Sequence, residues 1–92
     1  LLKRWPKNLI GQMGIGNTAY AMKDLESAKI AFLQAVQDHP EAAEAFNNLA
    51  HVLLDLNETS DALVAAEEAV KLGGPFLETS KITLEEIRKK IN

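Results

Sequence analysis

The three prolines of this 92-residue chain are almost evenly spaced, because Pro6, Pro40 and Pro75 lie 34 and 35 residues apart. A fixed period of this length is typical of repeat proteins, in which each unit is one small supersecondary structure stacked on the next. Two helical hydrophobic patterns lie between successive prolines, and they meet at residues 23–24 and again at residues 57–58. We therefore expect each unit to be a pair of antiparallel helices.

The second helix predicted for each unit carries alanines at matching positions. An offset of 34 residues superposes three pairs, namely Ala28 with Ala62, Ala31 with Ala65, and Ala35 with Ala69. Residues at i, i+3 and i+7 lie along one face of a helix, where small side chains let a neighbouring helix approach closely. The repeated alanines therefore predict a helix-packing seam.

The pattern predicts five helices, at residues 8–22, 24–38, 42–56, 58–72 and 76–91. Asp24 is a favourable N-cap for the second helix, and Gly73-Gly74 provide a left-handed end for the fourth. The last helix has an apolar face and a charged face, which suits the end of a stack of repeats. The expected organisation is one all-α domain over residues 1–92, with the end of a preceding unit at 1–6, units at 7–40 and 41–74, and a capping helix at 75–92.

Two sequence motifs recur in phase with this period. The first unit reads Gln12-x2-Ile15-Gly16-x2-Ala19, Ala28-x3-Phe32 and Pro40, and the second reads Phe46-x2-Leu49-Ala50-x2-Leu53, Ala62-x3-Ala66 and Pro75. They resemble the tetratricopeptide repeat, whose unit reads W-x2-L-G-x2-Y, A-x3-F and P. Gln12 and Ala66 depart from that pattern by replacing aromatic residues. The resemblance implies a right-handed α-solenoid whose first helices line a concave groove.

Composition and charge exclude several classes of function. The chain has no cysteine, which rules out disulfides and thiolate metal sites, and no apolar run approaches the length of a membrane span. Its net charge of −3 is unevenly distributed, because residues 9–80 hold three lysines against eleven acidic residues, a balance of −8. An acidic body opposes phosphate binding, so no nucleic-acid partner is expected, and neutral or basic protein segments are favoured.

No residue pattern points to catalysis, a metal or a cofactor. Gly11-x2-Gly14-x-Gly16 lies inside a helical pattern with no preceding strand, so it is not a phosphate-binding loop, and close helix approach is its expected role. His39 and His51 are the only histidines, and neither has a second ligand at helical spacing. We therefore expect a non-enzymatic protein without a cofactor.

The resemblance to the tetratricopeptide repeat implies which residues face the groove. They are Met13, Asn17 and Tyr20 of the first unit, and Glu44, Asn47, Asn48, His51, Leu54 and Asp55 of the second. Amides can hydrogen-bond a peptide backbone, and apolar side chains add contact area. The competing interpretation of Asn48 is that its amide ties adjacent helices together.

One use of such a groove, the clamping of a C-terminal carboxylate by lysine and asparagine, is disfavoured. Met13 stands where that clamp has a lysine, and the corresponding places in the last helix fall near Thr79 and Thr83. Charge-assisted hydrogen bonds would supply most of the strength of such a clamp.

The sequence therefore favours a protein-interaction module that binds a peptide or protein segment in its groove. The alternative is a scaffold or oligomerisation segment of a larger enzyme or lipoprotein, for example a bacterial one. Leu1, Leu2 and Trp5 would form an apolar edge that favours self-association, unless Trp5 folds back on the first helix. The sequence does not fix the cellular compartment.

Overall fold

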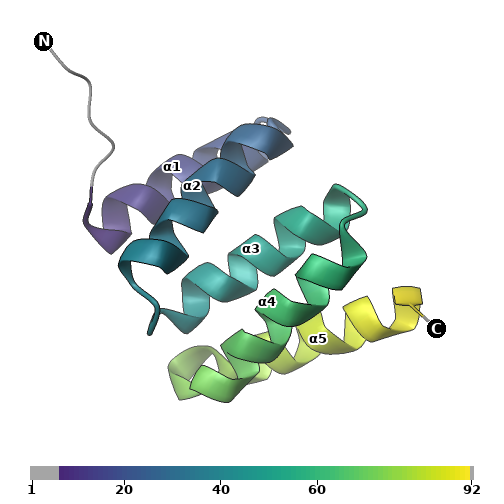
Figure 1. Cartoon of the computed structure of the whole chain (residues 1–92). Coiled ribbons are helices and arrows are strands. Elements are labelled where there is room, and N and C mark those ends of the chain that lie inside the picture. The colour runs from purple at the N-terminus through teal and green to yellow at the C-terminus, as the bar shows by residue number, and fades with distance from the viewer. Residues whose placement is uncertain (1–6, 92) are drawn as a thin grey trace, which may run out of the picture.

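The computed structural model describes residues 7–91, which form five α-helices (Figure 1). The elements are α1 (Leu9–Ala21), α2 (Leu25–Asp38), α3 (Ala43–Asp55), α4 (Thr59–Leu72) and α5 (Leu77–Ile91), with a 3₁₀ turn at Gly74–Phe76 before α5. This part of the chain contains no strand, and the helix ends lie within one residue of the predicted ones. The all-α prediction is thereby confirmed, whereas the expectations for Leu1, Leu2 and Trp5 lie outside the described residues.

The helices are arranged as a stack of hairpins (Figure 1). The most extensive contacts are within the pairs α1–α2 and α3–α4, and α2 packs against α3 to join one pair to the next. α5 packs against α4 and, less extensively, against α3. This is the predicted helical-repeat solenoid.

The turns inside the two hairpins have the same backbone geometry. Lys23 and Asn57, 34 residues apart, both have a left-handed φ of 64°. In each turn the N–H of the next residue, Asp24 or Glu58, donates to a carbonyl five residues earlier, at 2.9 and 2.8 Å. This is the hydrogen bond of a Schellman helix end. The Asp24 side chain also accepts a hydrogen bond from the Ser27 N–H, which confirms it as the N-cap of α2.

α4 ends through glycine, as predicted. Gly73 and Gly74 have φ values of 69° and 77°, a conformation that other residues adopt only with strain. Pro75 follows immediately inside the 3₁₀ turn. The chain therefore leaves α4 sharply and returns as α5 against the same hairpin.

The alanine seam lies in the core. All six alanines are at most 5% exposed: Ala28, Ala31, Ala35, Ala62, Ala65 and Ala69. Beside the seam, a Cβ added to Gly16 would lie 2.4 Å from the Phe32 ring, so α1 and α2 approach each other closely only because Gly16 has no side chain. The equivalent positions in the second hairpin are Ala50 and Ala66, both fully buried. The glycine–phenylalanine pair of the first hairpin thus corresponds to the Ala50–Ala66 pair of the second.

Gln12, which departs from the family pattern, is also explained by the fold. Its side chain is fully buried, and its Nε2 donates a 2.7 Å hydrogen bond to Asp38 Oδ2 at the end of α2. This hydrogen bond is the main reason that the pKa of Asp38 lies below its usual value. Gln12 therefore replaces aromatic packing by a polar link between the two helices.

Candidate functional site: the groove face

Three side-chain hydrogen bonds join α3 to its neighbours α1 and α5. They connect Asn17 with Asn48, Tyr20 with Asp55, and His51 with Thr83. We define the groove face as the side of α1, α3 and α5 that carries them: Asn17, Tyr20, Asn48, His51, Leu54, Asp55, Thr83, Glu86, Lys89 and Lys90.

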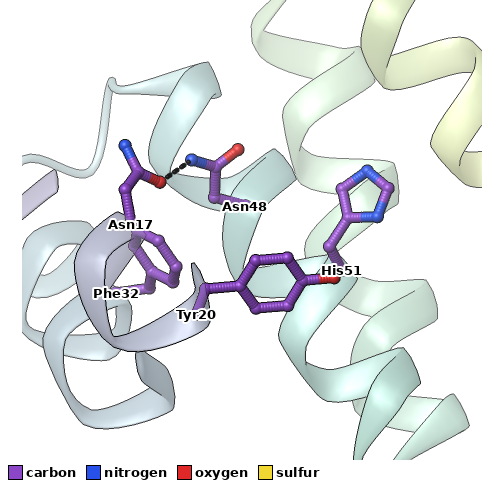
Figure 2. A pocket seen from close by; sticks show the side chains of 5 residues that line it. All are labelled: Asn17, Tyr20, Phe32, Asn48 and His51. Atoms are coloured by element: carbon purple, nitrogen blue, oxygen red, sulfur yellow. Dashed lines mark hydrogen bonds between the residues drawn. The ribbon is translucent and has the colours of Figure 1, made fainter. Parts of the chain in front are cut away.

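The two asparagines form a bridge that leaves hydrogen-bonding capacity on both amides. Asn48 Nδ2 donates to Asn17 Oδ1 at 3.0 Å (Figure 2). An amide side chain has two donor hydrogens and an acceptor oxygen, so the bridge uses only one donor and one acceptor of the pair. The Asn17 Nδ2 group and the Asn48 Oδ1 atom keep capacity for a further partner. The Asn48 amide therefore ties α3 to α1, as the competing interpretation of this residue expects. The same hydrogen bond holds both amides in place.

The bridge between Tyr20 and Asp55 perturbs the phenol. Tyr20 OH donates to Asp55 Oδ2 at 2.5 Å, and Tyr20 is 37% exposed. The hydrogen bond to the carboxylate, with smaller contributions from burial and from the negative charge, raises the pKa of Tyr20 to about 12. The phenol is therefore a fixed hydrogen-bond donor across the physiological pH range.

The bridge between His51 and Thr83 fixes a tautomer. Thr83 Oγ1 lies 3.0 Å from His51 Nε2 and 3.1 Å from the Thr79 carbonyl oxygen. The hydroxyl has one proton, which goes to the carbonyl, so it must accept a hydrogen bond from the imidazole. Neutral His51 therefore carries its proton on Nε2, and its Nδ1 is an acceptor.

A pocket of about 310 Å³ lies between these bridges, lined by Asn17, Tyr20, Phe32, Asn48 and His51. Figure 2 shows Asn17 and Phe32 on one side and His51 on the other. Phe32 comes from α2 and is 1% exposed, so its ring provides a buried aromatic floor. It reaches this position because Gly16 leaves room for the ring. The pocket therefore combines aromatic surface with an amide, phenol and imidazole rim.

A second hollow, of about 570 Å³, lies on the groove face between α3 and α5. It is lined by Leu54, Asp55, Glu86, Lys89 and Lys90. Lys89 and Lys90 are not among the groove residues predicted from the sequence, because charged residues on a terminal helix are typical of its solvent-exposed face. The 35-residue step from Pro40 to Pro75 would have found them, because the same step carries Leu54 to Lys89 and Asp55 to Lys90.

Seven of the nine residues predicted for the groove are at least partly accessible. Asn17, Tyr20 and Asp55 are exposed, and Glu44, Asn48, His51 and Leu54 are half-buried. Met13 and Asn47 are each only 5% exposed, and Met13 belongs to the apolar core. The prediction that Met13 and Asn47 face the groove is therefore wrong, because these side chains fill the interior and offer almost no surface to a partner.

Stacked antiparallel helix pairs, with side chains of the first helices gathered on one face, define an α-helical repeat protein. The model of one family, described as Tetratricopeptide repeat, matches residues 12–37 and 43–72. The chain belongs to this family, whose repeats are generally protein–protein interaction modules and typically non-enzymatic. None of the curated proteins matches the chain significantly. Among residues 7–91, no helix is long and apolar enough to cross a membrane.

Proposed function

We propose that this chain is a non-enzymatic interaction module that binds a segment of a partner protein along the groove face. The observation that carries the proposal is the pocket lined by Asn17, Tyr20, Phe32, Asn48 and His51. Pockets of this kind, with an apolar floor and a few oriented polar groups, are typical of binding sites.

The chemistry of the pocket suits a peptide. Asn17 Nδ2 can donate to a backbone carbonyl, and Asn48 Oδ1 can accept from a backbone N–H. The bridge between the two amides already restricts their rotamers, so less side-chain entropy is lost on binding. The aromatic floor can hold one large apolar side chain of the partner, for which Phe32 and Tyr20 supply contact area.

The charges on the groove face set the composition we expect of the partner. The acidic residues of the chain body, with Asp55 and Glu86 on the groove face, favour a neutral or basic segment. Lys89 and Lys90 line the hollow at the C-terminal end of α5. We therefore expect basic residues of the partner to lie away from these two lysines.

Selection of binders from a random-peptide library, followed by amide chemical-shift mapping of the selected peptide, tests the proposal. We expect the shifts to gather on α1 and α3 around Asn48, and Asn48→Ala to weaken binding by about 5- to 30-fold. Val64→Ala is the matched control, because Val64 is 65% exposed on α4 and lies outside the groove face. Shifts confined to α2 and α4, or equal affinities for both variants, would contradict the proposal.

A scaffold or self-association role is the alternative, and one observation favours it. α1 has a hollowed, partly apolar face outside the groove face. If library selection gives no groove-binding peptide and the chain self-associates, the scaffold role is preferred.

A further inference from the structure

The pocket of the groove face continues into a further hollow, of about 520 Å³, at the ends of α1 and α3. Tyr20 lines both spaces, and its ring extends from α1 towards α3 (Figure 2). The turn that follows each of these helices contributes a side chain, Lys23 after α1 and Asn57 after α3. This hollow therefore lies between two internal turns of the stack, and we call it the turn hollow.

The turn hollow combines apolar and basic side chains. Leu25 and Leu54, both half-buried, supply apolar surface. Lys23 reaches it from the turn between α1 and α2, and Lys90 reaches it from α5. Among residues 7–91, Asp55 is the one acidic residue that lines it, and its carboxylate already accepts the hydrogen bond from Tyr20 OH.

The two lysines have no ionic partner in the part of the chain that the structure describes. No carboxylate oxygen of residues 7–91 lies within 4.0 Å of either ammonium group. Glu86, one helical turn before Lys90, lines the neighbouring hollow with it, but the two are not paired. Two such cations beside apolar surface, on an otherwise acidic chain body, are complementary to one carboxylate.

We propose that the partner segment carries one aspartate or glutamate side chain, which lies in the turn hollow and contacts Lys23 and Lys90. The inference rests on the proposed function, because the same segment fills the pocket with its large apolar side chain. The remaining residues of the segment stay neutral or basic, as the other charges of the groove face favour.

The geometry of α3 sets the spacing of these two side chains in the partner. α3 contributes Asn48 and His51 to the pocket, and Leu54 and Asp55 to the turn hollow. The centres of the two pairs are five residues apart in α3, or about 7.5 Å along the helix axis. An extended segment advances about 3.3 Å per residue and presents side chains i and i+2 on the same side. We therefore expect the acidic residue two positions from the large apolar one.

A synthetic random-peptide library, amidated so that only side chains supply carboxylates, tests the inference. We expect groove-binding peptides to be enriched in an acidic residue two positions from a large apolar one. Replacing that acid by its amide should weaken binding to the wild type by about 3- to 20-fold, because each of two exposed ion pairs contributes up to about fivefold. Salt at about 0.5 M should remove most of this difference.

The double variant Lys23→Gln/Lys90→Gln should bind the acidic peptide and its amide counterpart equally. Lys71→Gln is the matched control, because Lys71 is an exposed lysine in the last turn of α4, as Lys90 is in the last turn of α5. Each lysine complements the dipole of its own helix, so an effect through stability alone would appear in both variants. Lys71→Gln should keep the full preference for the acidic peptide, and urea unfolding of each variant shows whether the fold is retained.

The outcomes separate this inference from the proposed function. Groove-binding peptides without an acidic preference, or a preference that survives in Lys23→Gln/Lys90→Gln, overturn the inference and leave the proposed function intact. A library that yields no groove-binding peptide overturns the proposed function, and the inference with it.

Discussion

At the scale of single residues, Gly14 and Gly16 occupy the same helix and have opposite environments. A Cβ on Gly16 would lie 2.4 Å from the Phe32 ring, whereas a Cβ on Gly14 would meet nothing within 4 Å. Both glycines cost helix propensity, by about 0.5–1 kcal/mol each relative to alanine. Only at Gly16 is that cost offset by close packing, and there it also admits the aromatic floor of the pocket.

We therefore expect opposite effects from the same substitution at the two glycines. Gly14→Ala should raise the free energy of unfolding by about 0.5–1 kcal/mol. Gly16→Ala should lower it by about 1–3 kcal/mol, because the Phe32 ring must move in a close-packed core. Urea unfolding of both variants and of the wild type checks this pair. Equal changes of the same sign would show that the contact with Phe32 does not constrain the helix pair.

Tyr20 provides a titration that reports the bridge between α1 and α3. Its pKa is raised to about 12, and it is the only tyrosine in the chain. Asp55→Asn should bring the Tyr20 pKa back towards its ordinary value of about 10, because the carboxylate no longer stabilises the protonated phenol. Ultraviolet absorbance titration of the two proteins checks this, and coincident curves would exclude the bridge in solution.

The same raised pKa has a definite sign for stability. The folded chain holds the phenol proton more tightly than the unfolded chain does. The contribution of the bridge is therefore fully present below about pH 10, the unfolded pKa, and is lost as the pH rises towards about 12. The stability difference between the wild type and Asp55→Asn should therefore be largest below about pH 10 and should shrink as the pH rises towards about 12.

At the scale of elements, the hairpin turns depend on left-handed residues that are not glycine. Lys23 and Asn57 have the same φ of 64°, but asparagine adopts this conformation at lower cost than lysine. The turn between α1 and α2 is thus the more strained of the two.

Lys23→Gly should therefore stabilise the chain by about 1 kcal/mol, and Asn57→Gly should have a smaller effect. The midpoint of thermal or urea unfolding measures both, with Lys23→Ala as the control that removes the lysine side chain but keeps the Cβ. If Lys23→Ala stabilises as much as Lys23→Gly, the effect comes from the side chain and not from the backbone conformation.

The elements themselves were predictable from local signals. Asp24, Gly73-Gly74 and Pro75 mark helix ends by their own conformational preferences, which do not depend on distant contacts. The groove face was less predictable. Register alone could not place Met13 and Asn47, because a helix residue near the edge of a face turns inward or outward according to its neighbours.

At the scale of the whole molecule, each helix pair contacts only its neighbours, so stability should be transmitted from one unit to the next. α5 buries Ile87 completely and exposes 61% of Ile82. We propose that α5 caps the stack, because Lys81, Glu85 and Arg88 on its remaining surface are exposed and charged.

Ile87→Ala should accordingly lower the free energy of unfolding by about 2–5 kcal/mol. Hydrogen exchange should accelerate most in α5 and α4, which contact each other, and least in α1. Ile82→Ala is the matched control, with little expected effect on either measurement. Uniform acceleration over all five helices would show that the chain unfolds as one unit, without the neighbour-to-neighbour behaviour of a repeat stack.

The sequence by itself determined the period, the helices, their turns and the alanine seam, because spacing, caps and small residues act over a few residues and repeat along the chain. Only the tertiary structure decided which side chains meet. The Phe32 ring reaches the pocket of the groove face from α2 because Gly16 leaves room for it. Asn48 hydrogen-bonds Asn17 because α3 and α1, which belong to different hairpins, lie side by side. Such contacts depend on positions in space that no local preference fixes.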